Sequence, residues 1–222
     1  MILLALSTSG RAASAALLKD GRPLAEATRD EGLTHSETIL PLAAELLEQS
    51  GLAPADVDVF AADIGPGSFT GVRIGVCAIN AMAATSGKPA VAVSSLAALR
   101  EGLPEERGPV CALLDARNGN AYAALFAGEA CAMQPAAVTV AELLPALPAG
   151  TLFVGDGAEA YRAEIASAVP GARFAPAERN LLTALPVARC AWRAFRAGNT
   201  VSEAMPLYLR PTQAERLYKE KK

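Results

Sequence analysis

Histidine is nearly absent from this chain, since His35 is the only one among 222 residues. A metal site built on two imidazoles is therefore excluded, and a serine or cysteine nucleophile activated by histidine would have to use His35. This residue stands where a helix is expected to begin. We expect it to bond to backbone or to a neighbour there. A partner or nucleotide contact is the second interpretation, and a general base is the least favoured.

Paired cysteines and long apolar runs are missing as well. The four cysteines form no CxxC pair and match no zinc ribbon or redox motif, so buried free thiols in a reducing compartment are expected. No stretch approaches the roughly 18 uncharged apolar residues of a membrane span. The apolar start, residues 1–6, lacks a basic region and is interrupted by residues 7–11, which argues against a signal peptide. These features predict a cytoplasmic protein without membrane association.

An excess of positive charge is also lacking. Twenty Lys and Arg residues stand against 23 Asp and Glu residues, which gives a net charge of −3. A wholly basic surface that binds nucleic acid unaided is therefore excluded. The tail, residues 210–222, carries five basic residues against two acidic ones and is expected to be a solvated, partly mobile end.

The first half of the chain alternates apolar runs with turn signals. This pattern indicates a mixed α/β unit of order β-β-β-α-β-α-β-α. Strands are predicted at residues 2–6, 13–18, 22–28, 57–64 and 90–93, and helices at 36–49, 69–86 and 94–101.

The second half begins like the first. Residues 111–126 repeat the strand, polar turn and strand of residues 3–18, which indicates a duplicated unit. The polar, breaker-rich segment 102–109 separates the halves, so we predict lobes at residues 1–103 and 104–222, with the C-terminal tail free to return to the first lobe. Later helices are predicted near residues 140–147, 159–168 and 182–197.

The loop Gly65-Pro66-Gly67 joins a strand to a helix. Such a junction presents free backbone N–H groups and the positive end of the helix, which suits a phosphate. The same residues also suit a tight turn in which Ser68 caps the helix, and no Gly-Lys-Ser/Thr follows to make a P-loop. The residues alone leave an anion site and a structural turn equally open.

Two helices carry more apolar surface than one sheet face requires. Residues 74–87 contain no charge, and the apolar residues of 36–49 cover more than one stripe. A helix that is apolar all round is either central core or half of an interface. The small residues on both helices favour close packing against another subunit, while a doubly covered helix inside a monomer is the alternative.

Four motifs resemble the TsaB (YeaZ) family. They keep their order over nearly the whole chain, and the eleven-residue glycine motif is the most specific. They are Gly65-Pro66-Gly67-Ser68-Phe69-Thr70-Gly71-Val72-Arg73-Ile74-Gly75, His35-Ser36-Glu37-Thr38-Ile39-Leu40-Pro41, Asp115-Ala116-Arg117 followed by Gly119 and Tyr122, and Pro206-Leu207-Tyr208-Leu209-Arg210.

The resemblance implies an α/β fold of the duplicated actin/Hsp70/sugar-kinase type, with two lobes that each hold a mixed sheet flanked by helices. It also implies a non-catalytic scaffold role in the synthesis of N6-threonylcarbamoyladenosine on tRNA. The partner would be a TsaD-type catalytic subunit, which holds the metal and transfers the threonylcarbamoyl group, and a TsaE-type ATPase joins the pair. The chain would contact tRNA only through this complex.

The same resemblance places the partner surface on the two amino-terminal helices. Because these helices are apolar, homodimerisation of the free chain is an alternative to binding the partner. The interface candidates are His35, Ile39, Leu40, Ala43, Phe69, Arg73, Gly75, Ala78 and Met82.

Two positions depart from the pattern of the relatives. Where the catalytic relative carries an HxxxH metal pair, this chain has Ser95 and Leu99, which cannot replace imidazoles at a tight metal site. Relatives usually carry Asp where Ser7 stands, and in kinases of this fold that carboxylate helps to hold a metal-bound phosphate. We therefore expect no catalytic residue, no metal, no peptidase chemistry despite the older glycoprotease label, and no tightly bound cofactor. ATP or ADP at the partner surface is left open.

The candidate nucleotide contacts are Ser7, Thr8, Ser9, Gly65 and Gly67. A small-molecule or acyl kinase of the same fold is the second reading of the function, and a protease or esterase is a distant third. The kinase would need paired carboxylates at a phosphate site and an adenosine pocket. Ser7 argues against the first requirement, and the sequence does not test the second.

Overall fold

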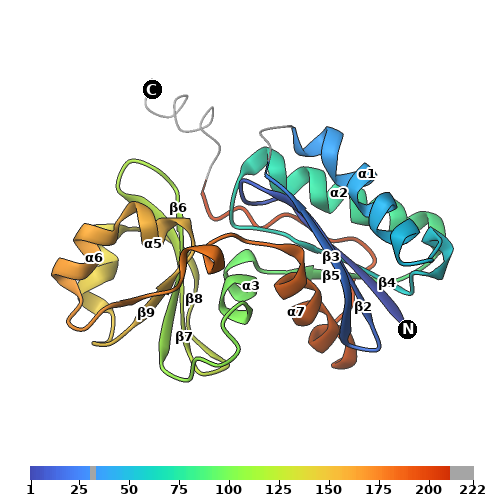
Figure 1. Ribbon diagram of the computed structural model, residues 1–222. Helices are drawn as coiled ribbons and strands as arrows, with labels where there is room; N and C mark the ends of the chain where they lie inside the picture. The colour runs from blue at the N-terminus through green and yellow to red at the C-terminus, as the bar shows by residue number, and fades with distance from the viewer. Residues whose placement is uncertain (31–33, 211–222) are drawn as a thin grey trace.

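The computed structural model describes residues 1–30 and 34–210 and shows two lobes, each built on a five-stranded sheet (Figure 1). The first sheet has the order β3-β2-β1-β4-β5 and the second the order β10-β9-β6-β7-β8. The strands are β1 (Ile2–Ser7), β2 (Ala13–Lys19), β3 (Arg22–Arg29), β4 (Val59–Asp63), β5 (Ala90–Val93), β6 (Pro109–Asp115), β7 (Asn120–Ala127), β8 (Ala130–Thr139), β9 (Leu152–Val154) and β10 (Arg173–Phe174).

The first lobe follows the order predicted from the sequence. β1 pairs antiparallel with β2 and parallel with β4, so it lies at the centre of the sheet and is buried on both faces. This explains its continuous apolar run. Helices α1 (His35–Gln49) and α2 (Phe69–Ser86) pack on one face of the sheet. On the other face lie α3 (Ser95–Glu101) and α7 (Ala184–Arg196).

The second lobe repeats the antiparallel hairpin in β6 and β7, and β9 runs parallel to β6. Its outer core packs against α4 (Val140–Leu143), α5 (Asp156–Ala160) and α6 (Arg162–Ala168). Two predicted helices are shorter than expected. Pro145 follows α4 and lies in a 3-10 turn, Leu144–Ala146. Tyr161 leaves the helical conformation between α5 and α6, where its hydroxyl bonds to Asp115.

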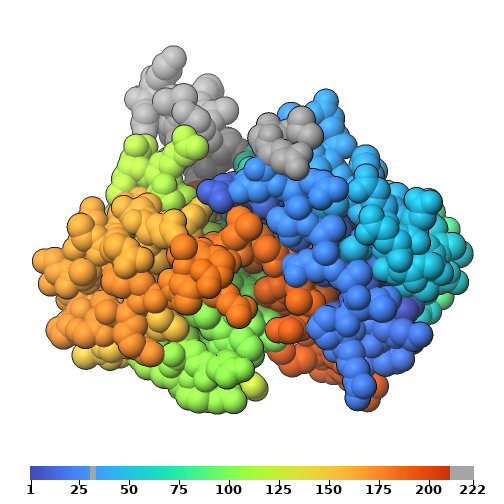
Figure 2. Space-filling view, in the orientation of Figure 1, coloured from blue at the N-terminus to red at the C-terminus, as the bar shows by residue number. Residues whose placement is uncertain are grey.

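The C-terminal part of the chain returns to the first lobe. α7, which the sequence division placed in the second half, packs against β1, β2, β4 and β5. Val201 then pairs with Ala90 at the edge of the first sheet. In Figure 2 the first lobe, in blue to cyan, lies beside the second, in green to orange. Apart from Arg210, the predicted basic tail lies outside the described residues.

Two features of the surface bear on the sequence predictions. Cys77 and Cys131 are exposed and Cys190 is half-buried, so the expectation of four buried thiols holds only for Cys111. Cys77 is exposed because it lies on the face of α2 that points away from the sheet.

None of the helices in residues 1–30 and 34–210 has both the length and the apolar character required to cross a membrane.

Candidate functional site

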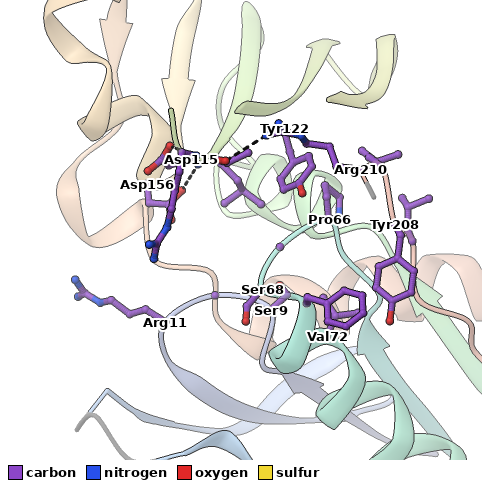
Figure 3. A pocket seen from close by; sticks show the side chains of 18 residues that line it. Ser9, Arg11, Pro66, Ser68, Val72, Asp115, Tyr122, Asp156, Tyr208 and Arg210 are labelled. Carbon is purple, nitrogen blue, oxygen red and sulfur yellow. Dashed lines mark hydrogen bonds between the residues drawn. The ribbon is translucent and has the colours of Figure 1, made fainter. Parts of the chain in front are cut away.

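A cleft of about 530 Å³ lies between the lobes, outside the carboxyl ends of β1 and β6. Open α/β sheets bind their ligands at this edge. The first lobe contributes the loop after β1 and the loop that leads into α2, and the second contributes the turn after β6 and the start of α5 (Figure 3). The last side of the cleft is formed by residues 207–210.

Asp63, a residue that the sequence analysis did not single out, lies buried behind this cleft at the end of β4. Its carboxyl group accepts hydrogen bonds from the hydroxyls of Ser7 at 3.1 Å and Ser95 at 3.4 Å, and from that of Ser9. The backbone N–H of Thr8 donates to it at 3.3 Å. Burial raises the pKa of Asp63, while these hydrogen bonds act in the opposite direction. The only sequence signal was an acidic residue closing an apolar strand.

This network corrects part of the predicted nucleotide site. Ser7 and Thr8 are completely buried and do not line the cleft, because their side chains are used inside the protein. Ser9 does reach the cleft wall, although its hydroxyl is already bonded to Asp63 and lies 3.0 Å from that of Ser95. Of the three residues, only Ser9 touches the cleft.

The Gly-Pro-Gly loop is held against the backbone of Ser9. The N–H of Ser68 donates to the Ser9 carbonyl at 2.8 Å, and the Ser68 hydroxyl accepts from the N–H of Gly71, as a helix cap. A Cβ atom on Gly67 would lie 2.6 Å from the Ser9 carbonyl oxygen, and Gly65 has a φ of +101°, so both positions require glycine. These bonds use N–H groups that an anion site would need, which favours the structural turn. Gly67 lines the cleft and Gly65 does not.

Thr8 also explains the small residues at the start of α2. Its hydroxyl donates to the Gly71 carbonyl at 2.7 Å, and a Cβ atom on Gly71 would overlap the Thr8 carbonyl oxygen. A Cβ atom on Gly75 would lie 2.5 Å from the Thr8 hydroxyl oxygen. Gly75 therefore lets α2 approach the turn after β1, and this contact inside the lobe accounts for the glycine; its role at a partner surface stays a prediction.

Replacing Gly71 by alanine should push α2 away from this turn. We expect a loss of about 1–3 kcal/mol in the free energy of unfolding, as for other overpacked sites, and a fall of roughly 2–12 °C in the melting temperature. Gly10→Ala is the matched control, because its Cβ atom would meet Leu182 at an ordinary 3.7 Å. Thermal melting followed by circular dichroism checks this. If both variants melt like the wild type, the close approach is not needed.

The second lobe presents a hydrogen-bonded acidic wall to the cleft. The Tyr161 hydroxyl donates to Oδ1 of Asp115 at 2.6 Å, and the Arg117 N–H donates to the same oxygen at 2.8 Å. The Asp115 N–H in turn donates to Asp156 at 2.9 Å. Desolvation, together with the Asp115 charge, raises the pKa of Asp156. Desolvation and the hydrogen bond to the Asp115 carboxylate raise the pKa of Tyr161 to about 12.

The Asp115-Ala116-Arg117 motif thus builds a turn that places Arg117 at the cleft. Arg117 and Asn118 have φ values of +63° and +55°, and the Asn120 amide bonds to the carbonyls of both. Within the part of the chain that the structure describes, no three His, Cys, Asp or Glu side chains gather closely enough to hold a metal ion.

The outer face of the first lobe has a shallow apolar groove between α1 and α2. Its volume is about 340 Å³, and Leu40 on its rim is 50% exposed. We call it the α1–α2 groove. Its lining residues are Leu4, Leu40, Ala43, Ala44, Leu47, Pro54, Ala55, Phe60, Met82, Thr85 and Ser86.

The predicted interface residues differ in how deeply the structure buries them. Ile39 and Gly75 are buried inside the first lobe, whereas Ala43, although largely buried, lines the α1–α2 groove. Ala78 and Met82 are partly buried on the outer side of the same core. Leu40, Phe69 and Arg73 are exposed, and Met82 lines the α1–α2 groove beside Leu40.

His35 acts at the helix entry, as the favoured interpretation predicted. Its Nε2 atom lies 2.9 Å from the Gly10 carbonyl oxygen, which ties the start of α1 to the loop after β1. The two positions of the relatives' metal pair are closed: Ser95 is 0% exposed and bonded to Asp63, while Leu99 is 2% exposed in the core between the lobes.

Comparisons with known proteins identify the family and the fold. Residues 30–203 match the family model of TsaD, tRNA N6-adenosine threonylcarbamoyltransferase. The chain is 37% identical over 126 residues to the tRNA threonylcarbamoyladenosine biosynthesis protein TsaB of Escherichia coli K12, a match that covers 55% of this chain and 53% of that protein. It thus spans about half the length of such curated relatives.

Two solved structures extend the comparison. YeaZ from Pseudomonas aeruginosa has a TM-score of 0.82 at 32% identity, over 94% of this chain and 99% of that one. The hexokinase of the ROK type from Thermus thermophilus has a TM-score of 0.52 at 15% identity, over 89% of this chain and 100% of that one, and shows the fold alone. The predicted actin/Hsp70/sugar-kinase-type fold is confirmed, and the chain belongs to the TsaB (YeaZ) family.

Proposed function

We propose that this protein is a non-catalytic scaffold subunit in the synthesis of N6-threonylcarbamoyladenosine on tRNA. Membership of the TsaB (YeaZ) family supports the pathway, since the E. coli relative is named for it. The observation that carries the scaffold role is the contrast between two places in the first lobe. The position of a metal pair is filled by buried Ser95 and Leu99, while the α1–α2 groove leaves apolar surface exposed.

The proposed partner is a TsaD-type catalytic subunit that covers the α1–α2 groove. Leu40 is a half-exposed apolar side chain that a partner would bury, and Met82 adds a flexible apolar wall. A TsaE-type ATPase would join the pair, and tRNA would be reached only through the complex, because the chain as a whole is acidic. The complex would work in the cytoplasm, and the free chain would cover the same groove by homodimerisation.

Co-purification from the native organism tests this proposal. The tagged chain should recover the cell's own TsaD relative in an equimolar complex, measured by light scattering after size-exclusion chromatography. Recovery of the tagged chain without that relative would contradict the proposal if the two purified proteins, mixed at concentrations well above those in the cell, also fail to form a complex.

A small-molecule or acyl kinase of the same fold is the second candidate, and the 530 Å³ cleft is the observation in its favour. Asp115 and Asp156 on the second lobe would have to act without a carboxylate at position 7, where Ser7 is buried. In the scaffold proposal, by contrast, any ATP or ADP would bind at the surface shared with the partner and not tightly to this chain alone. An ATPase assay on the pure chain separates the two candidates, because only a kinase should hydrolyse ATP.

The pure protein should hold no stoichiometric transition metal. Ser95 and Leu99 offer no imidazole, and the single histidine bonds to the Gly10 carbonyl. Elemental analysis after dialysis against a chelator is expected to find well under about 0.1 zinc or iron per chain. A tight metal site, in contrast, would retain about one ion per chain through the dialysis. One retained metal ion per chain would contradict both the scaffold role and the assignment of these positions.

A further inference from the structure

The segment that follows α7 is fastened along the first lobe. The Ala204 N–H donates to the Asn80 side chain at 2.8 Å, and the Asn80 amide donates back to the Ala204 carbonyl at 2.9 Å. Three residues later, the Leu207 N–H donates to the carbonyl of Ile64 at 2.7 Å. Residues 204–207 thus cross the outer helix α2 and reach the loop that follows β4.

Tyr208 then closes onto the start of α2. Its ring lies 4.8 Å from the Phe69 ring, between centroids, and its hydroxyl accepts a hydrogen bond from Nε of Arg73 at 2.7 Å. The Arg73 guanidinium lies over the Phe69 ring at 3.9 Å. These three side chains form a stacked cluster at the cleft edge, and all three are exposed, with Tyr208 at 43%.

Two residues further on, the segment touches the other lobe. Nη1 of Arg210 donates to the carbonyl of Ala116, in the turn after β6, at 3.3 Å. Between these anchors, residues 207–210 line the cleft, and Figure 3 shows Tyr208 and Arg210 along the same side of it, near Pro66.

We propose that residues 204–210 are a strap that sets the spacing of the two lobes and closes one side of the cleft, with Tyr208 as its clasp. The Asn80 pair fixes the strap on the first lobe, and the contacts that open beyond it are the Leu207 bond, the clasp and the Arg210 bond. An exposed aromatic stack and one hydrogen bond each change an equilibrium by about two- to twelvefold. The strap therefore opens at modest cost, and the spacing of the lobes follows it. This inference does not depend on the proposed partner.

The native cysteines allow a direct test. Cys77 lies on α2 and Cys131 on β8, one exposed thiol in each lobe. Cys111 is buried and Cys190 is half-buried, and burial raises the pKa of both to about 12, so a spin label reacts first with the two exposed thiols. Double electron–electron resonance then gives the distribution of distances between the lobes. Hydrogen exchange at the Leu207 N–H reports strap opening.

The variant Tyr208→Ala removes the stack and the hydrogen bond together. We expect exchange at Leu207 to become at least about tenfold faster, with a broader distance distribution shifted to longer values. Tyr208→Phe keeps the stack and should change exchange only a few-fold. Met205→Ala, in the same segment at an exposed position, should behave like the wild type.

Arg210→Ala provides a second route that leaves the clasp intact. It should broaden the distance distribution by releasing only the contact with Ala116. An unchanged distribution in both Tyr208→Ala and Arg210→Ala overturns the proposal, even if exchange in residues 204–210 accelerates. If Tyr208→Ala does not fold, the result for Arg210→Ala alone decides.

Discussion

Replacing Leu40 by glutamate is expected to weaken binding of a TsaD-type subunit by a factor of a hundred to several thousand. The change places an unpaired carboxylate in the apolar seam that the partner would cover, at a cost on the order of 3–5 kcal/mol, and each 1.4 kcal/mol changes the affinity about tenfold. Leu40 is half exposed in the free chain, so its replacement leaves the fold intact. Ala78 on α2 is less suitable, because it packs partly against the first lobe's own core.

The control is Leu24→Glu. Leu24 is 43% exposed on β3, close to the exposure of Leu40, and lines neither the α1–α2 groove nor the cleft between the lobes. Calorimetric titration of each variant with the partner gives the affinities, and circular dichroism confirms that both are folded. If Leu40→Glu binds as tightly as Leu24→Glu, the partner surface lies elsewhere on the chain.

Replacing Asp63 by alanine should cause a large loss of stability. The hydroxyls of Ser7, Ser9 and Ser95 would lose their common acceptor in a site that water does not reach. We expect a loss of about 3–5 kcal/mol, as for other buried networks that lose one partner, and a melting temperature lower by roughly 6–20 °C. A melting temperature within about 2 °C of the wild type would contradict the structural role of this carboxyl group.

The same residue should make stability depend on pH. Burial raises the pKa of Asp63 above its ordinary value of 3.8, so between these values the folded chain binds more protons than the unfolded chain. The stability that comes from protonation of Asp63 in the folded chain is complete below pH 3.8 and is lost as the pH rises through the pKa of the folded state. Denaturant melts should therefore show the wild type losing stability relative to Asp63→Asn as the pH increases. A constant difference between the two proteins across the range from pH 3.5 to 8 is the contrary result.

Local signals were enough to predict most elements of the first lobe. α2 begins and ends where the sequence placed it, because Ser68 caps its start and Gly87, with a φ of +64°, ends it. The lobe division was less complete. The prediction left the C-terminal tail free to return to the first lobe but kept α7 in the second, because the return of α7 depends on packing against the first sheet.

The site was harder to predict than the fold. A helix that is apolar all round does not show which face meets its own sheet, so the contact between Gly75 and Thr8 was not predicted. The Asp63 network joins side chains from β1, β4 and α3, and no spacing in the sequence brings them together. The motif residues Phe69, Arg73 and Tyr208 were all noted, but their stacking depends on the path of the strap.

Reconstituted threonylcarbamoyl transfer to tRNA would show whether this chain acts as a scaffold through the α1–α2 groove. The TsaD-type subunit, the TsaE-type ATPase and the synthase that supplies the threonylcarbamoyl adenylate would be assayed with this chain, without it, and with Leu40→Glu or Leu24→Glu in its place. We expect activity with the wild type and with Leu24→Glu, and with Leu40→Glu only the activity that is seen when the chain is omitted. Full transfer without this chain, or equal transfer with both variants, would contradict the scaffold role.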